Sequence, residues 1–292
     1  MARVRRKKYP SGFGKIIFFA VLIFAGVAIF FNRVSIRAYV EEMVRQNSLP
    51  PAQSFEEVNQ ASKNSQNHNI INQAVNIPII TNGNETNANV IGQTGVQNVQ
   101  ADKLPEEFNL SVPFTPQAPF AVWDPIHEDA CEEASVMMVD AFYTNRKFTA
   151  QSAEDEINSI VNWETKALGF WMDTNAEETA RILSEKYGYK NVKVVYDIGI
   201  DDIKREVAKG HPVILPAAGQ LLGNKYFQQP GPLYHMLVVR GWTKSDLIIT
   251  NDPGTKRGEG YLYEPDILIN AVHDWNGGDV VKGRKVMIVV EK

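Results

Sequence analysis

Hydrophobic and polar residues divide the 292-residue chain into three stretches of different character. The first holds an uninterrupted apolar run, Ile16–Phe31, which extends to residues 13–32 if Lys15 reaches its ammonium group back to the membrane surface. The second, residues 33–107, is polar, and the third, residues 108–292, carries helical and strand patterns of apolar residues. We therefore expect one folded domain at the C-terminal end, since a stretch of that length can bury a core without disulfides.

The apolar run fits a membrane-spanning helix better than the alternative, a cleaved secretory signal. Sixteen residues rise about 24 Å as a helix, whereas a signal peptide typically has an apolar region of only ~7–15 residues. No small-x-small cleavage site follows the run. Residues 1–15 carry six basic residues and no acid, which keeps them inside the cell by the positive-inside rule. We expect a cytoplasmic basic tail over residues 1–12, a transmembrane signal anchor over residues 13–32, and a domain outside the cytoplasmic membrane.

The polar stretch, residues 33–107, is expected to be an Asn/Gln-rich tether. Twelve Asn and eight Gln fall between residues 46 and 101, with a single aromatic residue, Phe55. Such a segment buries too little apolar area to offset the entropy of ordering it. A spacer between membrane and domain is the simplest interpretation, and Asn/Gln-driven self-association is the alternative.

Residues 108–292 predict an α+β domain in which helices come first and antiparallel strands later. From Cys131 to Phe142, apolar residues recur at the helical spacing i, i+3, i+4, i+7, which indicates a helix buried on most sides. Further helices are predicted over residues 153–161 with Ser152 as N-cap, from the Asn175 capping box to residue 187, and over residues 201–209 and 266–272. Strands are predicted over residues 108–112, 192–196, 212–215, 235–242, 247–251 and 285–290.

Charge and cysteine content exclude several classes of function. The formal charge of −4 includes the six basic residues near the N-terminus, so residues 16–292 sum to −10, which argues against a nucleic-acid partner. The single cysteine can form neither an intrachain disulfide nor a Cys-rich zinc site. We expect no cofactor and no metal.

That cysteine, Cys131, lies where a loop rich in Pro and aromatic residues becomes the apolar helix. The positive end of a helix dipole favours a thiolate over a thiol. Glu132 and Glu133 act in the opposite direction, because negative charge beside the sulfur raises the pKa of the thiol. A nucleophilic role for Cys131 therefore requires a base.

Among the five histidines, His235 has the best-placed partner. It opens a predicted strand whose hairpin mate ends just before Asp252. A two-residue turn puts His235 directly opposite Asp252, and a four-residue turn makes them diagonal neighbours, with Cβ atoms ~4.5–8 Å apart. An acid there can fix the imidazole tautomer. His127 is a rival, but the segment His-Glu-Asp-Ala-Cys lacks the second His of a His-Glu-x-x-His zinc site, and its role stays open.

Several short segments together resemble one family. A loop with Gln117 and a tryptophan, then Cys131 at the head of an apolar helix, then KGHPVILPA, YHMLVVRGW and IITNDPG are similar to the C39-like branch of the papain-like cysteine peptidases, over roughly residues 110–290. The resemblance implies a papain-like α+β fold with an N-terminal helical part and a C-terminal antiparallel sheet. It also implies that Cys131 is the nucleophile, that His235 is general base and acid, and that Asp252 orients the imidazole. Gln117 would donate to an oxyanion hole completed by the Cys131 N–H.

Two departures from the family pattern qualify what the resemblance implies. Many relatives have Gly-Pro directly after the cysteine, where this chain has Glu132-Glu133, so the shape and charge of the cleft are expected to differ. Members that trim bacteriocin leaders are fused to a transporter ATPase, but this chain has no Gly-x-x-x-x-Gly-Lys-Ser/Thr phosphate loop. Leader processing coupled to export is not implied.

We therefore expect a membrane-anchored, extracytoplasmic cysteine peptidase that hydrolyses peptide or isopeptide bonds through a thioester acyl-enzyme. Its partners would be a peptide or protein substrate and, through the N-terminal helix, the membrane. Two alternatives use the same scaffold: a non-catalytic module that binds peptides or cell-wall polymer, and an acyltransferase or cell-wall amidase with the same triad.

Overall fold

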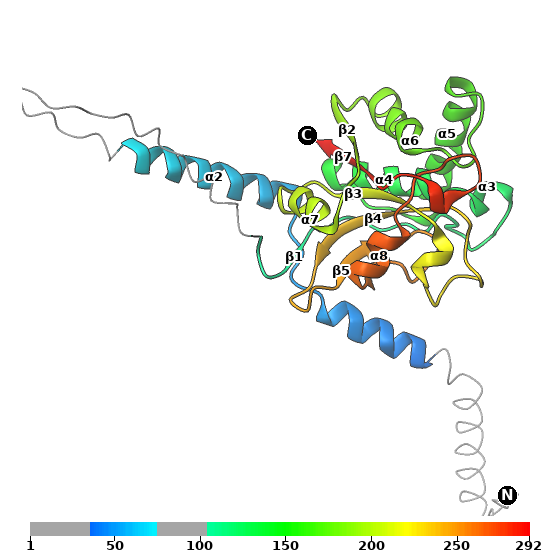
Figure 1. The fold of residues 1–292 in the computed structure, drawn as a ribbon, viewed down its shortest axis with the longest axis horizontal. Helices are drawn as coiled ribbons and strands as arrows, with labels where there is room; N and C mark the ends of the chain where they lie inside the picture. The colour runs from blue at the N-terminus through cyan, green and yellow to red at the C-terminus, as the bar shows by residue number, and fades with distance from the viewer. Residues whose placement is uncertain (1–35, 75–103) are drawn as a thin grey trace, which may run out of the picture. The chain divides into compact units, whose positions relative to one another are not determined.

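The computed structural model describes residues 36–74 and 104–292, with the side chains of residues 65–74 excepted (Figure 1). The predicted signal anchor, residues 13–32, and the tether residues 75–103 lie outside the described residues. Within the described ranges, no helix has both the length and the hydropathy to cross a membrane. Residues 36–48 form a helix that belongs to a unit separate from the one that begins at Leu49.

The second unit begins with helices and ends with strands, as the sequence predicts. Before the sheet come α2 (Phe55–Ala74), the two-residue strand β1 (Phe108–Asn109), α3 (Pro125–Glu128), α4 (Cys131–Thr144), α5 (Ala150–Ala167) and α6 (Ala176–Arg181), which continues as a π-helical turn (Ile182–Lys186). Two further helices, α7 (Ile200–Ala208) and α8 (Pro265–Ala271), connect strands, and two short 3-10 turns cover Gly219–Leu222 and Val280–Lys282.

An antiparallel sheet forms the other half of the domain. Its strands are β2 (Asn191–Tyr196), β3 (Val213–Ala217), β4 (His235–Trp242), β5 (Ile248–Asn251), β6 (Tyr261–Tyr263) and β7 (Val286–Glu291), in the spatial order β2-β7-β3-β4-β5-β6. The short strand β1 also pairs with β4. The central strands β3 and β4 are buried along their whole length, and α4 packs against both of them. Helix and sheet thus meet where Cys131 and His235 begin their elements.

Helix α4 is buried because apolar side chains surround it on all sides. Val136, Met137 and Met138 are fully inaccessible to solvent, and every residue from Cys131 to Tyr143 is buried. The helix ends at Asn145, which adopts the left-handed conformation (φ 54°) common after a helix C-terminus. The prediction of a buried helix that starts at Cys131 is confirmed.

Helix α5 differs from its prediction at both ends. It runs from Ala150 to Ala167 rather than over residues 153–161. Thr149, not Ser152, is the N-cap: the Ser152 N–H donates to Thr149 Oγ1 at 3.1 Å, and Ser152 Oγ accepts from the Thr149 N–H at 2.9 Å. This reciprocal pair uses a serine in the place that Glu or Gln usually fills, which is why the pattern gave the wrong start.

The segment predicted as an Asn/Gln-rich tether, residues 33–107, contains structure at its N-terminal part. Ser54 and Glu57 form a capping box that opens α2, and Gln53 bridges to Leu110 beside β1. Phe55 packs edge-on against Tyr143 with ring centroids 5.1 Å apart, and Val58 is part of the core. A few apolar residues within a polar composition are thus enough to hold this stretch on the domain.

The register of the β4–β5 hairpin is set by its turn and by a bulge in β4. Trp242 pairs with Ile248 across the turn, and Arg240 is skipped, so that Val238 pairs with Asn251. One step further, Asp252 is in line with Leu237 and is therefore a diagonal neighbour of His235. The bulge gives the diagonal register that the four-residue turn predicts, although five residues, 243–247, separate the paired Trp242 and Ile248.

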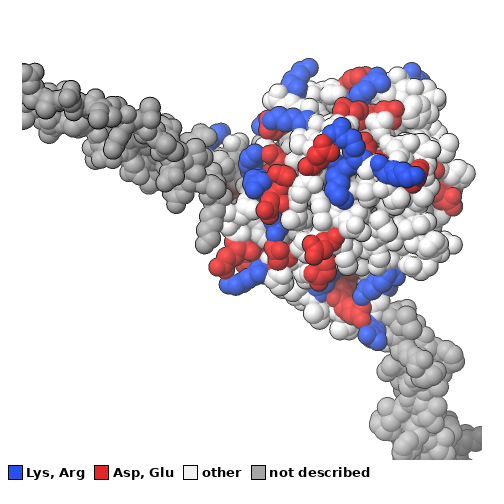
Figure 2. Space-filling model, in the orientation of Figure 1, with Lys and Arg blue, Asp and Glu red and all other residues white. Residues whose placement is uncertain are grey.

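The charged surface of this unit is mixed. Figure 2 shows Lys and Arg interspersed with Asp and Glu on the face in view, beside a broad area without charged residues. Exposed ion pairs such as Arg284–Asp197 and Lys193–Glu291 are part of this pattern. Such exposed pairs contribute little stability individually.

Candidate active site

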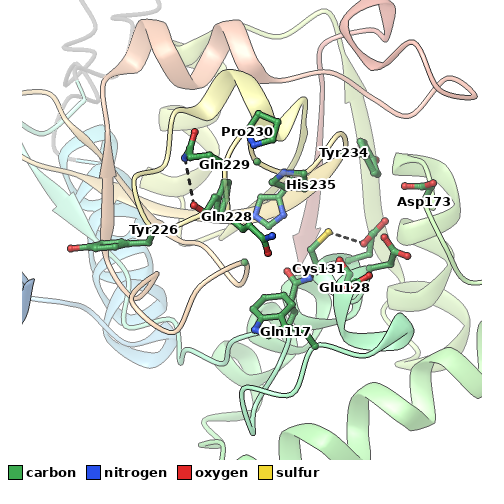
Figure 3. A pocket seen from close by; sticks show the side chains of 17 residues that line it. Gln117, Glu128, Cys131, Asp173, Tyr226, Gln228, Gln229, Pro230, Tyr234 and His235 are labelled. Atoms are coloured by element: carbon green, nitrogen blue, oxygen red, sulfur yellow. Dashed lines mark hydrogen bonds between the residues drawn. The ribbon is translucent and has the colours of Figure 1, made fainter. Parts of the chain in front are cut away.

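A cavity of about 480 Å³ lies where the head of α4 meets the start of β4. Gln117, Cys131 and His235 all line it, together with residues 226–232 of the loop before β4. Figure 3 shows the Cys131 sulfur and the His235 ring in the middle of this pocket. Asp252 lies directly behind His235 and is completely buried. The structure thus brings together all four residues that the sequence singles out.

The Cys131 sulfur is held between two elements. It accepts a hydrogen bond from the Met236 N–H at 3.3 Å, which places it one residue from His235 in β4. The thiol itself donates to Glu132 Oε2 at 2.9 Å. Burial raises the pKa of the Cys131 thiol well above its usual value, and the charge of Glu132 and this hydrogen bond raise it further, while the Met236 N–H lowers it. Burial and the neighbouring Glu132 thus favour the thiol over the thiolate.

Asp252 is held as a carboxylate by four donors. Its Oδ1 accepts from His235 Nε2 at 2.8 Å and from the Gly254 N–H at 3.1 Å, and its Oδ2 accepts from the Tyr263 hydroxyl at 2.6 Å and Asn224 Nδ2 at 2.9 Å. Burial alone raises the pKa of this carboxyl, but the charge of His235 and the hydrogen bonds outweigh burial and lower it. An ionised carboxylate only accepts hydrogen bonds, so Nε2 of His235 carries a proton and Nδ1 of the neutral ring is the free base.

The imidazole of His235 is fixed by close packing as well. Phe227 lies edge-on to the ring with centroids 5.2 Å apart. A Cβ at Gly254 would lie 2.8 Å from the Phe227 ring and 2.9 Å from His235 Cε1. Only glycine lets the turn after Asp252 approach the two rings this closely.

Gln117 lines the pocket, but its side-chain amide is engaged with the backbone. Nε2 donates to the carbonyl oxygens of His127 at 2.9 Å and Glu128 at 3.1 Å, while its buried Oε1 has no hydrogen-bond partner in the described structure. Its own N–H donates to the Pro253 carbonyl at 2.9 Å, which ties this loop to the turn after Asp252. Donation to an oxyanion requires the release of one of the side-chain contacts.

The comparisons with known proteins identify the family. The model of the family described as Peptidase_C39 like matches residues 109–276, which is more than half of the chain. The chain is a member of the C39-like peptidase family. No curated protein matches it.

Two solved structures are similar to this C39-like chain at low identity. One, described as a C39-like peptidase from Bacillus anthracis, is 12% identical with a TM-score of 0.38, covering 62% of this chain and 96% of that one. The other is a Cys-to-Ala mutant of a prointerpain A fragment from Prevotella intermedia, 19% identical with a TM-score of 0.28, covering 39% of this chain and 33% of that one. The family and the order of elements together give the α+β papain-like fold, helices first and antiparallel sheet later.

His127 lies outside the residues that line the pocket of this C39-like chain. Its ring contacts Asp124 Oδ1 at 2.8 Å and Glu154 Oε2 at 3.0 Å, so that it links α3 to α5. Through its carbonyl it also positions Gln117. A structural role accounts for all of these contacts.

One group of residues in the described part of the chain has the composition of a metal site. Glu206, His211 and Glu291 bring their ligand atoms within 4.8 Å of one another. Each carboxylate already has a cationic partner, Lys209 for Glu206 and Lys193 for Glu291, and His211 is hydrogen-bonded to Glu206. None of these three residues lines the pocket, so this group has no part in the chemistry of Cys131.

Two residues that contact Asp252 were not predicted from the sequence. Asn224 and Tyr263 both donate to Asp252, and Asn224 Nδ2 also donates to the Tyr263 hydroxyl at 3.0 Å. Tyr263 belongs to β6, which pairs with β5 and was not predicted. The alternation Tyr261-Leu-Tyr was the available signal for this strand. Nothing in the sequence pattern singles out Asn224.

Proposed function

We propose that this protein is a cysteine peptidase that hydrolyses peptide or isopeptide bonds through Cys131, His235 and Asp252. The observation that carries the proposal is the 2.8 Å contact of His235 Nε2 with a fully buried carboxylate, beside a thiol in the same pocket. An acid that fixes the imidazole by its Nε2–H leaves Nδ1 to take the thiol proton. Membership of the C39-like family supports a peptide substrate.

The proposed reaction proceeds in two halves. His235 Nδ1 takes the proton of Cys131, the sulfur attacks the substrate carbonyl carbon, and the C=O becomes an oxyanion. The Cys131 N–H at the first turn of α4 stabilises this oxyanion, together with Gln117 once one of its N–H groups turns from the backbone carbonyls. His235 then protonates the leaving amine, and the C–N bond breaks to leave a thioester. Water, deprotonated by His235, attacks the thioester and releases the acid and the thiol.

The test compares the full-length protein with Cys131→Ala and His235→Ala variants. A peptide library incubated with each protein and analysed by mass spectrometry should show new termini only with the unmodified chain. Either substitution should lower the rate by at least ~10³-fold, because the nucleophile and its base act as a unit. Product release that persists in Cys131→Ala overturns the proposal.

One observation favours a second candidate, a non-catalytic module that binds peptides in the same pocket. The thiol is hydrogen-bonded to Glu132, and burial and this neighbour raise its pKa. A thiol with a raised pKa is a weak nucleophile near neutral pH. Alkylation by iodoacetamide near neutral pH distinguishes the two: a catalytic Cys131 reacts faster than in the unfolded chain and loses this advantage in His235→Ala.

We also propose that residues 13–32 anchor the peptidase domain outside the cytoplasmic membrane. The support is the charge asymmetry around the apolar run, with six basic residues before it and no acid. Externally added protease should digest the domain in intact spheroplasts, and the protein should remain with membranes after a carbonate wash. Protection of the domain in intact spheroplasts contradicts the proposed orientation.

A further inference from the structure

One end of the pocket is acidic. Four carboxyl side chains line it, and no Lys or Arg is among its lining residues in the described structure. They lead inward from the exposed Glu128, through the partly buried Asp129 and Asp173, to Glu132, which is 1% exposed. Figure 3 shows Glu128 near the sulfur and Asp173 at the edge of the pocket on the same side.

The four carboxyls have no cationic partner of their own. Within the described residues, none of them forms an ion pair with Lys or Arg. Burial raises the pKa of Asp129, and the charges of Asp173 and Glu128 raise it further. Burial raises the pKa of Glu132 well above its usual value, the charge of Glu133 raises it further, and the charge of Asp173 makes a smaller contribution. Asp173 thus lies close enough for its charge to act on both Asp129 and Glu132.

Glu132 is the carboxyl of the four that lies buried beside the thiol. The described partners of its buried carboxyl are the Cys131 thiol and its own backbone N–H. When Cys131 loses its proton, that donor disappears, and a thiolate and a carboxylate face each other away from bulk water. Adjacent buried anions are costly unless a cation pairs with them. His235 takes the thiol proton and becomes the cation that pairs with the thiolate, but among the lining residues in the described structure no Lys or Arg pairs with Glu132.

The opposite end of the pocket has the opposite character. Tyr226 lines that end, and the cationic groups of Lys225 and Arg257 each lie 5.1 Å from the centroid of its ring. Figure 3 shows Tyr226 and Asp173 on opposite sides of the Cys131–His235 pair. The pocket is thus polarised across the sulfur, with carboxylates at one end and cations behind an aromatic wall at the other.

We propose that the acidic end of the pocket is a subsite for a cationic group of the substrate. The preferred substrate class is then a peptide with an amino or guanidino side chain next to the bond that is cleaved. This inference rests on the proposed function for its substrate, and it makes Asp129, Asp173 and Glu132 the residues that select charge. A cation bound there also compensates the charge of Glu132 as the thiol proton moves to His235.

The first experiment measures charge selection without peptidase activity. Because Cys131 is the only cysteine, modification of the full-length protein by a thiol reagent reports this site alone. The probes are aminoethyl and sulfonatoethyl methanethiosulfonate, which are similar in size and opposite in charge. Their rate ratio, divided by the ratio for the unfolded chain, should exceed ~10, since charged clefts change encounter rates by ~10–10³-fold.

Variants show which carboxyls cause the preference for the cationic reagent over the anionic one. Asp129→Asn with Asp173→Asn should bring it close to the unfolded value, and Glu128→Gln, at an exposed position, should lower it partway. The matched control is Glu107→Gln, which changes net charge equally at an exposed position outside the pocket. A ratio equal to that of the unfolded chain, or one unchanged by the pocket variants, overturns the inference.

The second experiment uses peptides that differ only by Lys, norleucine or Glu next to one bond. The kcat/KM should fall at least ~10-fold from Lys to norleucine and further to Glu, and the double Asn variant should narrow these differences. Equal kcat/KM for the three peptides overturns the inference. If no peptide is cleaved while the reagent ratio remains high, the proposed function fails and the cationic subsite stands.

Discussion

The thiol of Cys131 donates a hydrogen bond to Oε2 of Glu132, the next residue in the chain, at 2.9 Å. The proton that the proposed reaction must move to His235 is thus shared with a carboxyl group in the resting protein. Since the helix dipole of α4 favours a thiolate, burial and Glu132 must together outweigh it. The residue after the nucleophile is therefore the natural place to alter thiol reactivity.

Glu132→Gln should increase the reactivity of Cys131. The substitution removes the charge that, after burial, contributes most to the raised pKa of the thiol. The pH profile of iodoacetamide alkylation should move to lower pH by about one unit or more, which is ~10-fold in rate near neutrality. Glu107→Gln is the control for net charge. An unchanged profile means that Glu132 is already neutral and does not govern the thiol.

Tyr263→Phe should raise the pKa of Asp252, the carboxylate that accepts a hydrogen bond from His235. The Tyr263 hydroxyl is one of the donors that lower the pKa of Asp252, so its loss raises that pKa. A carboxyl with a lowered pKa stabilises the fold above its unfolded value of 3.8, and this contribution is lost as the pH falls through the folded value. Acid unfolding of the variant, followed by circular dichroism, should therefore begin at higher pH.

The control for Tyr263→Phe removes a hydroxyl of the same kind at the surface. Tyr196 donates to Glu177 Oε1 at 3.2 Å in an exposed position. Tyr196→Phe should leave the acid unfolding midpoint unchanged. If both variants shift the midpoint equally, loss of a tyrosine hydroxyl causes the shift wherever it occurs, and the pKa of Asp252 does not.

The sequence was sufficient for the elements that carry the nucleophile and its base. The apolar periodicity after Cys131 is strong because α4 is buried on all sides, and the hairpin that carries His235 is marked by two apolar strands around a polar turn. Both signals depend on local pattern. The side on which Asp252 falls followed from the two-residue periodicity of the strands.

The features that could not be predicted from the sequence depend on contacts between segments that are far apart in the chain. The bulge at Arg240 reflects a buried guanidinium that donates to the Val112 carbonyl at 3.2 Å, which no local pattern encodes. Glutamate is rarely buried, so the burial of Glu132 could not be expected from its type. The charge of the pocket likewise arises because Asp173, far along the chain, lies beside Asp129.

Gly254→Ala should lower activity through His235. The added Cβ would lie 2.8–2.9 Å from the rings of Phe227 and His235, so one of them has to move. We expect a loss of about 1–3 kcal/mol in stability and at least a ~10-fold fall in kcat/KM, because the imidazole leaves its position against Asp252. Gly199→Ala is the control, since its Cβ meets nothing closer than 3.7 Å. Full activity in Gly254→Ala contradicts the requirement for close packing.

A second pair of acids, Glu133 and Glu164, lies buried beneath the site. Both side chains are 0% exposed, and none of their four oxygens has a hydrogen-bond partner among the described residues. Burial raises the pKa of Glu133 well above its usual value, and the charge of Glu164 is the next largest cause. Burial also raises the pKa of Glu164 to about 8, although the neighbouring Glu133 carboxyl and the charge of Lys186 limit this rise. Since neither carboxyl forms an ion pair among the described residues, one of them must keep its proton and donate it to the other.

This pair should make the protein less stable as the pH rises. A carboxyl whose folded pKa is raised contributes stability that is complete below its unfolded value of 4.5 and is lost as the pH rises to about 8. Glu164→Gln removes this dependence, since a neutral amide can donate to Glu133 at any pH. We expect melting temperatures of the variant and the unmodified chain to be similar near pH 5, and the variant to be several degrees higher near pH 8. Glu107→Gln should follow the unmodified chain at both pH values, and a parallel decline in Glu164→Gln would show that the loss of stability comes from other groups.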